Sequence, residues 1–416
     1  MAGVLVRHQP VIAGERMTEI NALTDNPREL GLRLREARKA AGLTQDAAAQ
    51  QLGVARTTLI AMEKGERRVQ ANELIQLAAF YRRSLNDLLR PGKPIEPFAV
   101  QLRATITNDE EIAEAIEAPM WAFQQLCEDY FELERLCGAP MAMNYPLERP
   151  SAGTRAEAAG DDMAVRERLR LGLGDGPIPN LRLLLEQDVG LRIFYLDFPS
   201  SVAAMFSYDP SLGGCIAVNA KHPYERRRQS LAHEYAHFLS SRRRAEVTIL
   251  QRYRRYPDHE RLANSFARTF LMPADGVTRR VNEVKAAKEG RFTYADICNL
   301  AYYYGVSIEA LTRRLEDLKL AGAGAWEKLK ASGFKASEAR AILGIAGPPA
   351  VDDLLPPRYR FVALEGYRDG KLSESQLAHF LRVDRMDARR IVEESGPSAN
   401  DVGNADMMGD QDEFVR

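Results

Sequence analysis

The sequence predicts a multidomain, mainly α-helical protein with an all-α head, an α+β domain holding a small sheet, and a small all-α C-terminal domain. Its 416 residues exceed the roughly 100 to 200 that a single domain commonly spans. Apolar residues recur at helical spacing over most of the chain, whereas β-type alternation is confined to a few short segments. Pro- and Gly-rich stretches separate these regions.

The domain divisions follow these changes in pattern. Residues 1–25 show no sustained periodicity, and the end of the chain is acidic and rich in Gly, Asn and Asp. We expect a flexible arm over 1–25, a helical head over 26–92, a strand, long helix and linker over 93–161, an α+β domain over 162–321, a small helical domain over 322–395 and a disordered acidic tail over 396–416.

Apolar spacing and capping residues predict the individual elements. In the head we expect helices over 28–41, 44–52, 55–64, 72–81 and 85–89. A strand over 98–104, one helix over 109–137 and a linker over 139–161 follow. The α+β domain should contain helices over 162–171, 180–187, 225–241, 260–271, 294–304 and 308–318, with strands over 191–196, 202–208 and 215–219. The last part should hold a helical hairpin over 326–345 and a helix–turn–helix-like pattern over 373–394.

Composition excludes several classes of protein. Hydrophobic residues make up 45% and charged residues 28% of the chain, which excludes wholesale disorder. No apolar run approaches the roughly 18 residues that cross a bilayer, and the first residues lack a signal-peptide core, so we expect a cytoplasmic protein without membrane contact. The four cysteines form no CxxC pair, which argues against a disulfide scaffold and a thiolate metal site. The net charge of −1 hides a basic head, because residues 26–92 carry twelve Lys/Arg against seven Asp/Glu.

The head contains the spacing of a helix–turn–helix. Small residues (Ala48, Ala49) allow close crossing of the two helices, Gly53 makes the turn, and Val54 fixes their angle. The second helix would then present its exposed face to the major groove, with Arg56 as a guanine reader. The alternative is an ordinary helical bundle with a solvated basic face. The candidate DNA-binding residues are Gln45, Arg56, Thr57, Thr58, Ile60, Ala61 and Lys64.

This segment resembles the Xre family of Cro/C1-type helix–turn–helix domains. The resemblance rests on LRLREARKAAGLTQ at 32–45, GVARTT at 53–58 and the Glu63-x-Gly65 that follows. It implies binding of double-stranded DNA. Ile60 and Ala61 stand where the family often has polar residues, so we expect few base contacts. Paired half-sites would suit a homodimer.

The α+β domain contains an HExxH motif, His233-Glu234-Tyr235-Ala236-His237. Residues four apart lie on one helix face, so both imidazoles can bind one zinc ion, and Glu234 can act as general base. The third ligand with the best placement is Glu260, 23 residues after His237, and Asn264 one turn later could orient a ligand. The alternatives are a histidine pair on an amphipathic helix, and a carboxylate that only complements a helix dipole.

Residues 180–320 resemble the ImmA/IrrE family of metallo-endopeptidases. The matching segments are GCIAVN at 214–219, ERRRQSLAHEYAH at 225–237, ERLANSFARTFLMP at 260–273 and VSIEALTRRL at 306–315. The resemblance implies a zincin-like fold, zinc bound by His233, His237 and Glu260, and Glu234 as catalytic base. Tyr235 and Ala236 depart from the HELGH that is commoner in the family, at positions that are not ligands.

Together these observations predict a DNA-binding transcriptional regulator with a zinc-dependent endopeptidase domain. The resemblance implies a repressor- or antitoxin-type substrate, or the chain itself, in a stress or mobile-element response. Single-stranded DNA is a candidate activator, although Tyr302, Tyr303 and Tyr304 fit helix core and surface better than a platform on which its bases stack. The alternative is a non-catalytic repressor whose peptidase-like domain senses a ligand, DNA or a partner. The pattern over 373–394 fits three alternatives: a second DNA-contacting motif, a dimer-forming motif or a helical docking domain.

Overall fold

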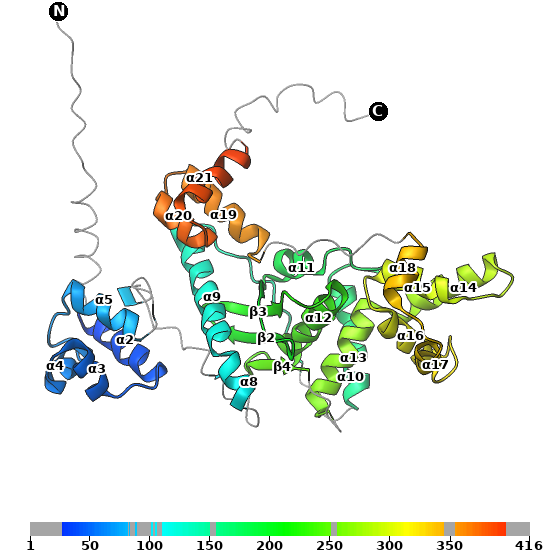
Figure 1. The fold of residues 1–416 in the computed structure, drawn as a ribbon, viewed down its shortest axis with the longest axis horizontal. Helices are drawn as coiled ribbons and strands as arrows, with labels where there is room; N and C mark the ends of the chain where they lie inside the picture. The colour runs from blue at the N-terminus through cyan, green and yellow to red at the C-terminus, as the bar shows by residue number, and fades with distance from the viewer. Residues whose placement is uncertain are drawn as a thin grey trace, which may run out of the picture. The chain divides into compact units, whose positions relative to one another are not determined.

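The computed structural model describes residues 27–81, 83, 88–89, 101–102, 105, 110–149, 155–250, 256–344 and 354–396. The chain divides into two compact units, Met1–Val100 and Gln101–Arg416. Both are mainly helical, and the second contains a four-stranded sheet, which confirms the multidomain, mainly α-helical fold class (Figure 1). None of the described helices is long and apolar enough to cross a lipid bilayer.

The head begins where the sequence predicts. Its helices are α2 (Pro27–Ala40), α3 (Gln45–Leu52), α4 (Arg56–Glu63) and α5 (Ala71–Phe80). The Thr44 hydroxyl caps α3 by accepting a hydrogen bond from the amide of Ala47, and Gly53 ends α3 with a left-handed φ of 66°. Of the predicted helix over 85–89, only Leu88 and Leu89 are among the described residues, and both are helical.

Two features hold α2 against α4. A Cβ at Gly31 would lie 2.5 Å from the carbonyl oxygen of Met62, so only glycine allows this backbone approach. Nearby, the buried Arg38 guanidinium donates to the buried Glu63 carboxylate at 2.6 Å. This pair satisfies two charges that burial would otherwise make costly.

The start of the second unit differs from the prediction. The prediction of a strand over 98–104 is wrong at Gln101 and Leu102, which are helical. The rest of that segment lies outside the described residues. The single helix over 109–137 is two helices, α8 (Glu110–Ala115) and α9 (Glu117–Cys137). Their junction is Ile116, and Pro119 follows in the first turn of α9, where proline is tolerated. In one continuous helix Pro119 could not donate to the carbonyl of Ala115, so it accounts for the break.

The sheet has the strand order β1-β3-β2-β4. Its strands are β1 (Arg192–Leu196), β2 (Val202–Asp209), β3 (Gly213–Asn219) and β4 (Glu246–Ile249). β1 pairs with β3 in parallel, while β2 pairs antiparallel with both β3 and β4. The sequence predicted the first three strands and missed β4, which has only four residues.

Helices cover both faces of the sheet. On one face α9 lies against β1, where the ring of Phe194 contacts those of Phe123 and Tyr130. On the other face lies α12 (Tyr224–Ser241), whose Phe238 contacts Phe206 of β2. β1, β2 and β3 are therefore mostly buried on both sides, and α12 packs against β2 and β3.

The remaining helices of this core are α10 (Ala156–Arg170), α11 (Leu181–Leu184) with a π-helical turn at Leu185–Val189, α13 (Asp258–Leu271), α14 (Ala274–Ala287), α15 (Tyr294–Tyr304) and α16 (Ile308–Asp317). Of these, α11 and α13 pack on α12, and α10 packs on α13. α10 starts six residues before the predicted 162, and α14 was not predicted. A Cβ on Gly160 of α10 would lie 2.4 Å from the carbonyl oxygen of Leu262 in α13, so these two helices touch through their backbones.

Part of the predicted linker over 139–161 belongs to the core. The amide of Asn144 donates to the carbonyl of Val189, and the amide of Arg149 donates to that of Leu239. Residues 150–154 lie outside the described residues. The segment up to Arg149 is thus hydrogen-bonded to α12 and to the π-helical turn.

The last helices are α17 (Ala325–Ala331), α18 (Ala336–Ile342), α19 (Pro357–Arg368), α20 (Glu374–Leu381) and α21 (Arg385–Glu394). The first two lie where the hairpin was predicted, but α17 packs on α16 and α18 on α15. The last two occupy the predicted helix–turn–helix-like pattern. α19 packs on α9, where the rings of Tyr359 and Tyr130 lie 4.9 Å apart and Arg358 donates to Glu134 at 2.7 Å.

Candidate metal centre and DNA-binding surface

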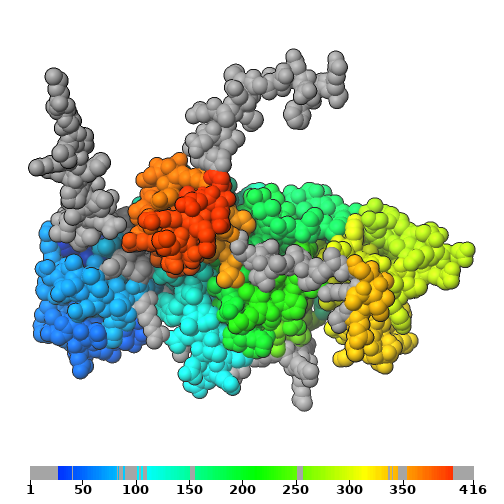
Figure 2. Space-filling model, turned by 45° about the horizontal axis from the view of Figure 1, so that its top comes forward, coloured from blue at the N-terminus to red at the C-terminus, as the bar shows by residue number. Residues whose placement is uncertain are grey.

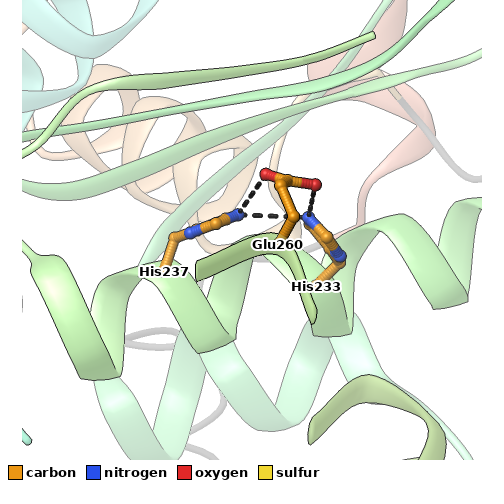
Figure 3. Close-up of side chains that lie close together, drawn as sticks. All are labelled: His233, His237 and Glu260. Carbon is orange, nitrogen blue, oxygen red and sulfur yellow. Dashed lines mark hydrogen bonds and ion pairs between the residues drawn. The ribbon is translucent and has the colours of Figure 1, made fainter. Parts of the chain in front are cut away.

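The HExxH residues lie on α12, and α13 brings Glu260 to them (Figure 3). The Nε2 atoms of His233 and His237 are 3.1 Å apart. One oxygen of Glu260 is 3.4 Å from Nε2 of His233, and the other is 3.3 Å from Nε2 of His237. Two imidazole nitrogens and a carboxylate therefore point to one location, which is a donor set that zinc accepts.

Asn264 lies one turn after Glu260 on α13. Its Oδ1 is 3.2 Å from Nδ1 of His233, so an Nδ1–H on this imidazole would donate to it. That hydrogen bond leaves Nε2, the nitrogen nearest Glu260, free of its proton and able to bind a cation. A hydrogen bond on the far nitrogen is how metal-binding histidines are commonly oriented.

Glu234 is completely buried beside these residues. Its Oε1 accepts a hydrogen bond from the hydroxyl of Thr248 on β4 at 2.6 Å. Within the described part of the chain, Oε2 has no hydrogen-bond partner. Burial raises the pKa of Glu234 to about 8. The sequence did not indicate Thr248, because only the pairing of β4 with β2 brings it to α12.

Two more side chains that the sequence did not select lie near Glu260. Glu246 on β4 and His259 on α13 form a second group of candidate ligands that shares Glu260. Nε2 of His259 is 3.8 Å from a carboxylate oxygen of Glu260. Burial raises the pKa of Glu246 to about 7 and lowers that of His259. The site is therefore richer in carboxylates than the motif alone indicates.

Opposing effects set the pKa values of the three candidate ligands. Burial by itself would raise the pKa of Glu260, but hydrogen bonds from the two imidazoles and their charge hold it well below its usual range. Burial lowers the pKa of His237 to about 4. Burial also acts to lower the pKa of His233, but the hydrogen bond to Glu260 and its negative charge outweigh this and raise it. A divalent cation would lower the pKa of every group around it, including Glu234.

The candidate DNA-binding residues lie on α3, α4 and the residue after α4. None of the seven is buried, and Arg56, Thr57 and Lys64 are exposed. The Arg56 guanidinium lies 3.7 Å from Asp46 and donates to Gln45 at 3.5 Å. Gln45 in turn donates to the buried Glu63 at 2.9 Å, so the Arg38–Glu63 pair helps to position it.

Comparison with known families gives two matches. Residues 34–88 match the model of the helix–turn–helix family, and residues 186–316 match that of the IrrE N-terminal-like domain. No curated protein matches the chain. The chain therefore combines a Cro/C1-type helix–turn–helix domain with an IrrE/ImmA-like domain of metallopeptidase type, as the motifs indicated. The second match spans the sheet, α12 and α13, and so includes the whole candidate metal centre.

Proposed function

We propose that this chain is a cytoplasmic DNA-binding regulator whose second unit is a zinc-dependent endopeptidase. The observation that carries this proposal is the convergence of His233, His237 and Glu260 next to a buried carboxylate, Glu234. We further propose that the substrate is a repressor- or antitoxin-type protein, or the chain itself. The helix–turn–helix domain would bring the peptidase unit to DNA-bound targets.

The donor set fits a zinc ion. His233 and His237 would bind it through Nε2, and Glu260 through its carboxylate, with Asn264 orienting His233. Three protein ligands leave a position open, which is typical of catalytic zinc sites. When bound, zinc supplies Lewis-acid polarisation of the scissile carbonyl and makes a water molecule more acidic.

Glu234 is suited to be the proton acceptor once a cation is present. Without a cation, burial keeps its carboxyl largely protonated at neutral pH, because its pKa is about 8. A nearby positive charge favours the carboxylate, which restores a base at working pH. Thr248 holds Oε1, so the second oxygen, Oε2, is the atom that would accept the proton and later return it to the leaving amine.

The decisive experiment compares cells that express the wild-type chain with cells that express Glu234→Gln. New protein N-termini, labelled and identified across the proteome, should appear with the wild type and be absent with the variant. The substitution keeps the size and the Thr248 hydrogen bond but removes the base, which contributes about 10²- to 10⁴-fold in rate. Zinc content by elemental analysis should be equal in the two purified proteins.

Thr269→Val is a matched control, because it alters a buried polar side chain on α13 that faces Asp161 and not the metal centre. Cells that express Thr269→Val should show the same new protein N-termini as cells that express the wild type. Identical N-termini in wild type and Glu234→Gln would contradict the peptidase and favour a regulator that senses without cleaving.

A further inference from the structure

The pair α20 and α21 repeats the architecture of α3 and α4. A shift of 329 in numbering places Ser373 on Thr44. Each of these two residues caps its helix with its hydroxyl, which accepts from Ala47 at 3.1 Å in the head and from Gln376 at 3.3 Å in the tail. The first helix of each motif therefore begins with the same kind of N-terminal cap.

The turns between the helices are also alike. Gly53 has a φ of 66°, and Arg382, at the equivalent position, has a φ of 58°. The next residue is valine in both: the Val54 amide donates to Ala49 at 3.0 Å, and the Val383 amide donates to Ala378 at 3.1 Å. An arginine in the left-handed region is strained, so the tail keeps this turn geometry without the residue that favours it.

The buried positions correspond as well. Ala48 and Ala49 of α3 are buried, and so are Leu377 and Ala378 of α20. In the second helix, Leu59 of α4 and Ala388 of α21 are both completely buried. α20 and α21 are therefore a second helix–turn–helix, with its first helix and α19 packed on the end of α9.

The same shift identifies the face of α21 that corresponds to the groove-facing side of α4. Arg56, Thr57, Ile60 and Ala61 of α4 correspond to Arg385, Met386, Arg389 and Arg390 of α21. All four tail residues are exposed, and Met386 is 70% exposed. Figure 2 shows α20 and α21, in orange and red, on the outside of their unit. This face holds three arginines where the head holds one.

We propose that α20 and α21 form a second binding surface for duplex DNA, with Arg385, Arg389 and Arg390 contacting phosphates or base edges. These side chains now contact Ser375, Glu374 and Asp387 on the motif itself. Such exposed pairs are weak and exchange readily for phosphate. Arg56 of the head is paired in the same way, with Asp46.

This proposal goes beyond the DNA binding of the head, because it gives one chain two duplex-binding surfaces. The chain could then contact two half-sites, or two separate duplexes, without a second copy. It is also independent of the peptidase, since no residue of the metal centre takes part.

The test uses the full chain and a random-sequence 30-base-pair duplex, with dissociation constants measured by fluorescence anisotropy at several salt concentrations. The variant combines Arg385→Ala, Arg389→Ala and Arg390→Ala. Each lost phosphate contact should lower the slope of log affinity against log salt by about 0.9, so the slope should fall by about 2 to 3. Affinity in low salt should fall about tenfold or more.

The matched control removes three exposed arginines elsewhere on the same unit, with Arg279→Ala, Arg280→Ala and Arg291→Ala. It should leave the slope within about 0.5 of the wild type. The single variant Arg390→Glu repeats the test with the motif otherwise intact, and the slope should again fall. An unchanged slope in the triple variant and in Arg390→Glu would overturn the proposal. Loss of self-association or of a bound protein, with DNA affinity unchanged, would assign the motif to a protein partner instead.

Discussion

The head and the metal centre were both found from short motifs, yet they use their residues in opposite ways. In the head, the candidate DNA contacts are exposed or half-buried, while the buried charges Arg38 and Glu63 hold the fold. In the metal centre, the candidate functional residues His233, Glu234 and His237 are themselves buried. Fold and function are thus separable in the head and coupled in the metal centre. Four predictions test this difference.

The largest effect is expected from Glu260→Ala. Loss of one of three protein ligands should reduce the zinc content from about one ion per chain to nearly none, because a site with two histidines binds zinc far less tightly. Elemental analysis of protein purified without a metal-affinity step measures this. Glu309→Ala, which removes an exposed carboxylate paired with Arg313, is the control and should keep the zinc. Full zinc content in Glu260→Ala would show that it is not a ligand.

Glu63→Ala should unfold the head while leaving the zinc content unchanged. Removing one partner of a buried ion pair costs about 3 to 5 kcal/mol, since it leaves Arg38 charged and unpaired. Hydrogen exchange of amides in α2 to α5 reports the loss. Glu66→Ala, at an exposed position, should exchange like the wild type. Unchanged protection in Glu63→Ala would mean that the pair contributes little to the head.

The contribution of Glu234 to the stability of the metal-free protein should be lost as pH rises. Burial raises the pKa of Glu234 in the folded chain to about 8, above its usual 4.5, so its contribution is fully present below pH 4.5 and is lost as pH rises through 8. The loss is on the order of a few kcal/mol, measured as the urea midpoint with a chelator present. Glu234→Gln should reduce this pH dependence without abolishing it, because burial raises the pKa of Glu246 to about 7. Equal pH dependence in both proteins would contradict a protonated Glu234.

The smallest effect on folding is expected from Arg56→Ala. It should weaken binding to a DNA selected by the wild type by about 1 to 3 kcal/mol. It should change unfolding free energy by less than about 0.5 kcal/mol, because the side chain is exposed. Anisotropy and urea unfolding measure the two quantities, and Arg35→Ala on α2 is the control. Equal DNA affinity in Arg56→Ala and the wild type would remove it from the contact surface.

The sequence predicted those elements whose signals are local. The bounds of α3 and α4 agree with the prediction to within one or two residues, because a capping threonine and a turn glycine mark them. β4 was missed because its four residues form a strand only by pairing with β2. The break at Ile116, by contrast, does have a local signal, which the prediction did not use: Pro119 has no amide hydrogen to donate to the carbonyl of Ala115, so a continuous helix is disfavoured there.

The same division applies to the metal centre. His233, His237 and Glu260 lie at helical spacing or at a helix start, so the sequence placed them near one another. Thr248 and Glu246 come from β4, and their positions beside Glu234 and Glu260 depend on strand pairing. A pattern along one segment cannot show which side chains a distant strand contributes.

The contact between Gly160 and the carbonyl of Leu262 has a consequence for how this protein can vary. Leu262 lies two residues after Glu260, and a methyl group at position 160 would force α13 away from α10. In a library of all single substitutions, position 160 should therefore tolerate as little change as the histidines, although it belongs to no motif. Related proteins that keep this site should therefore also keep a glycine at this position. The glycine would then help to recognise relatives that the two histidines alone do not identify.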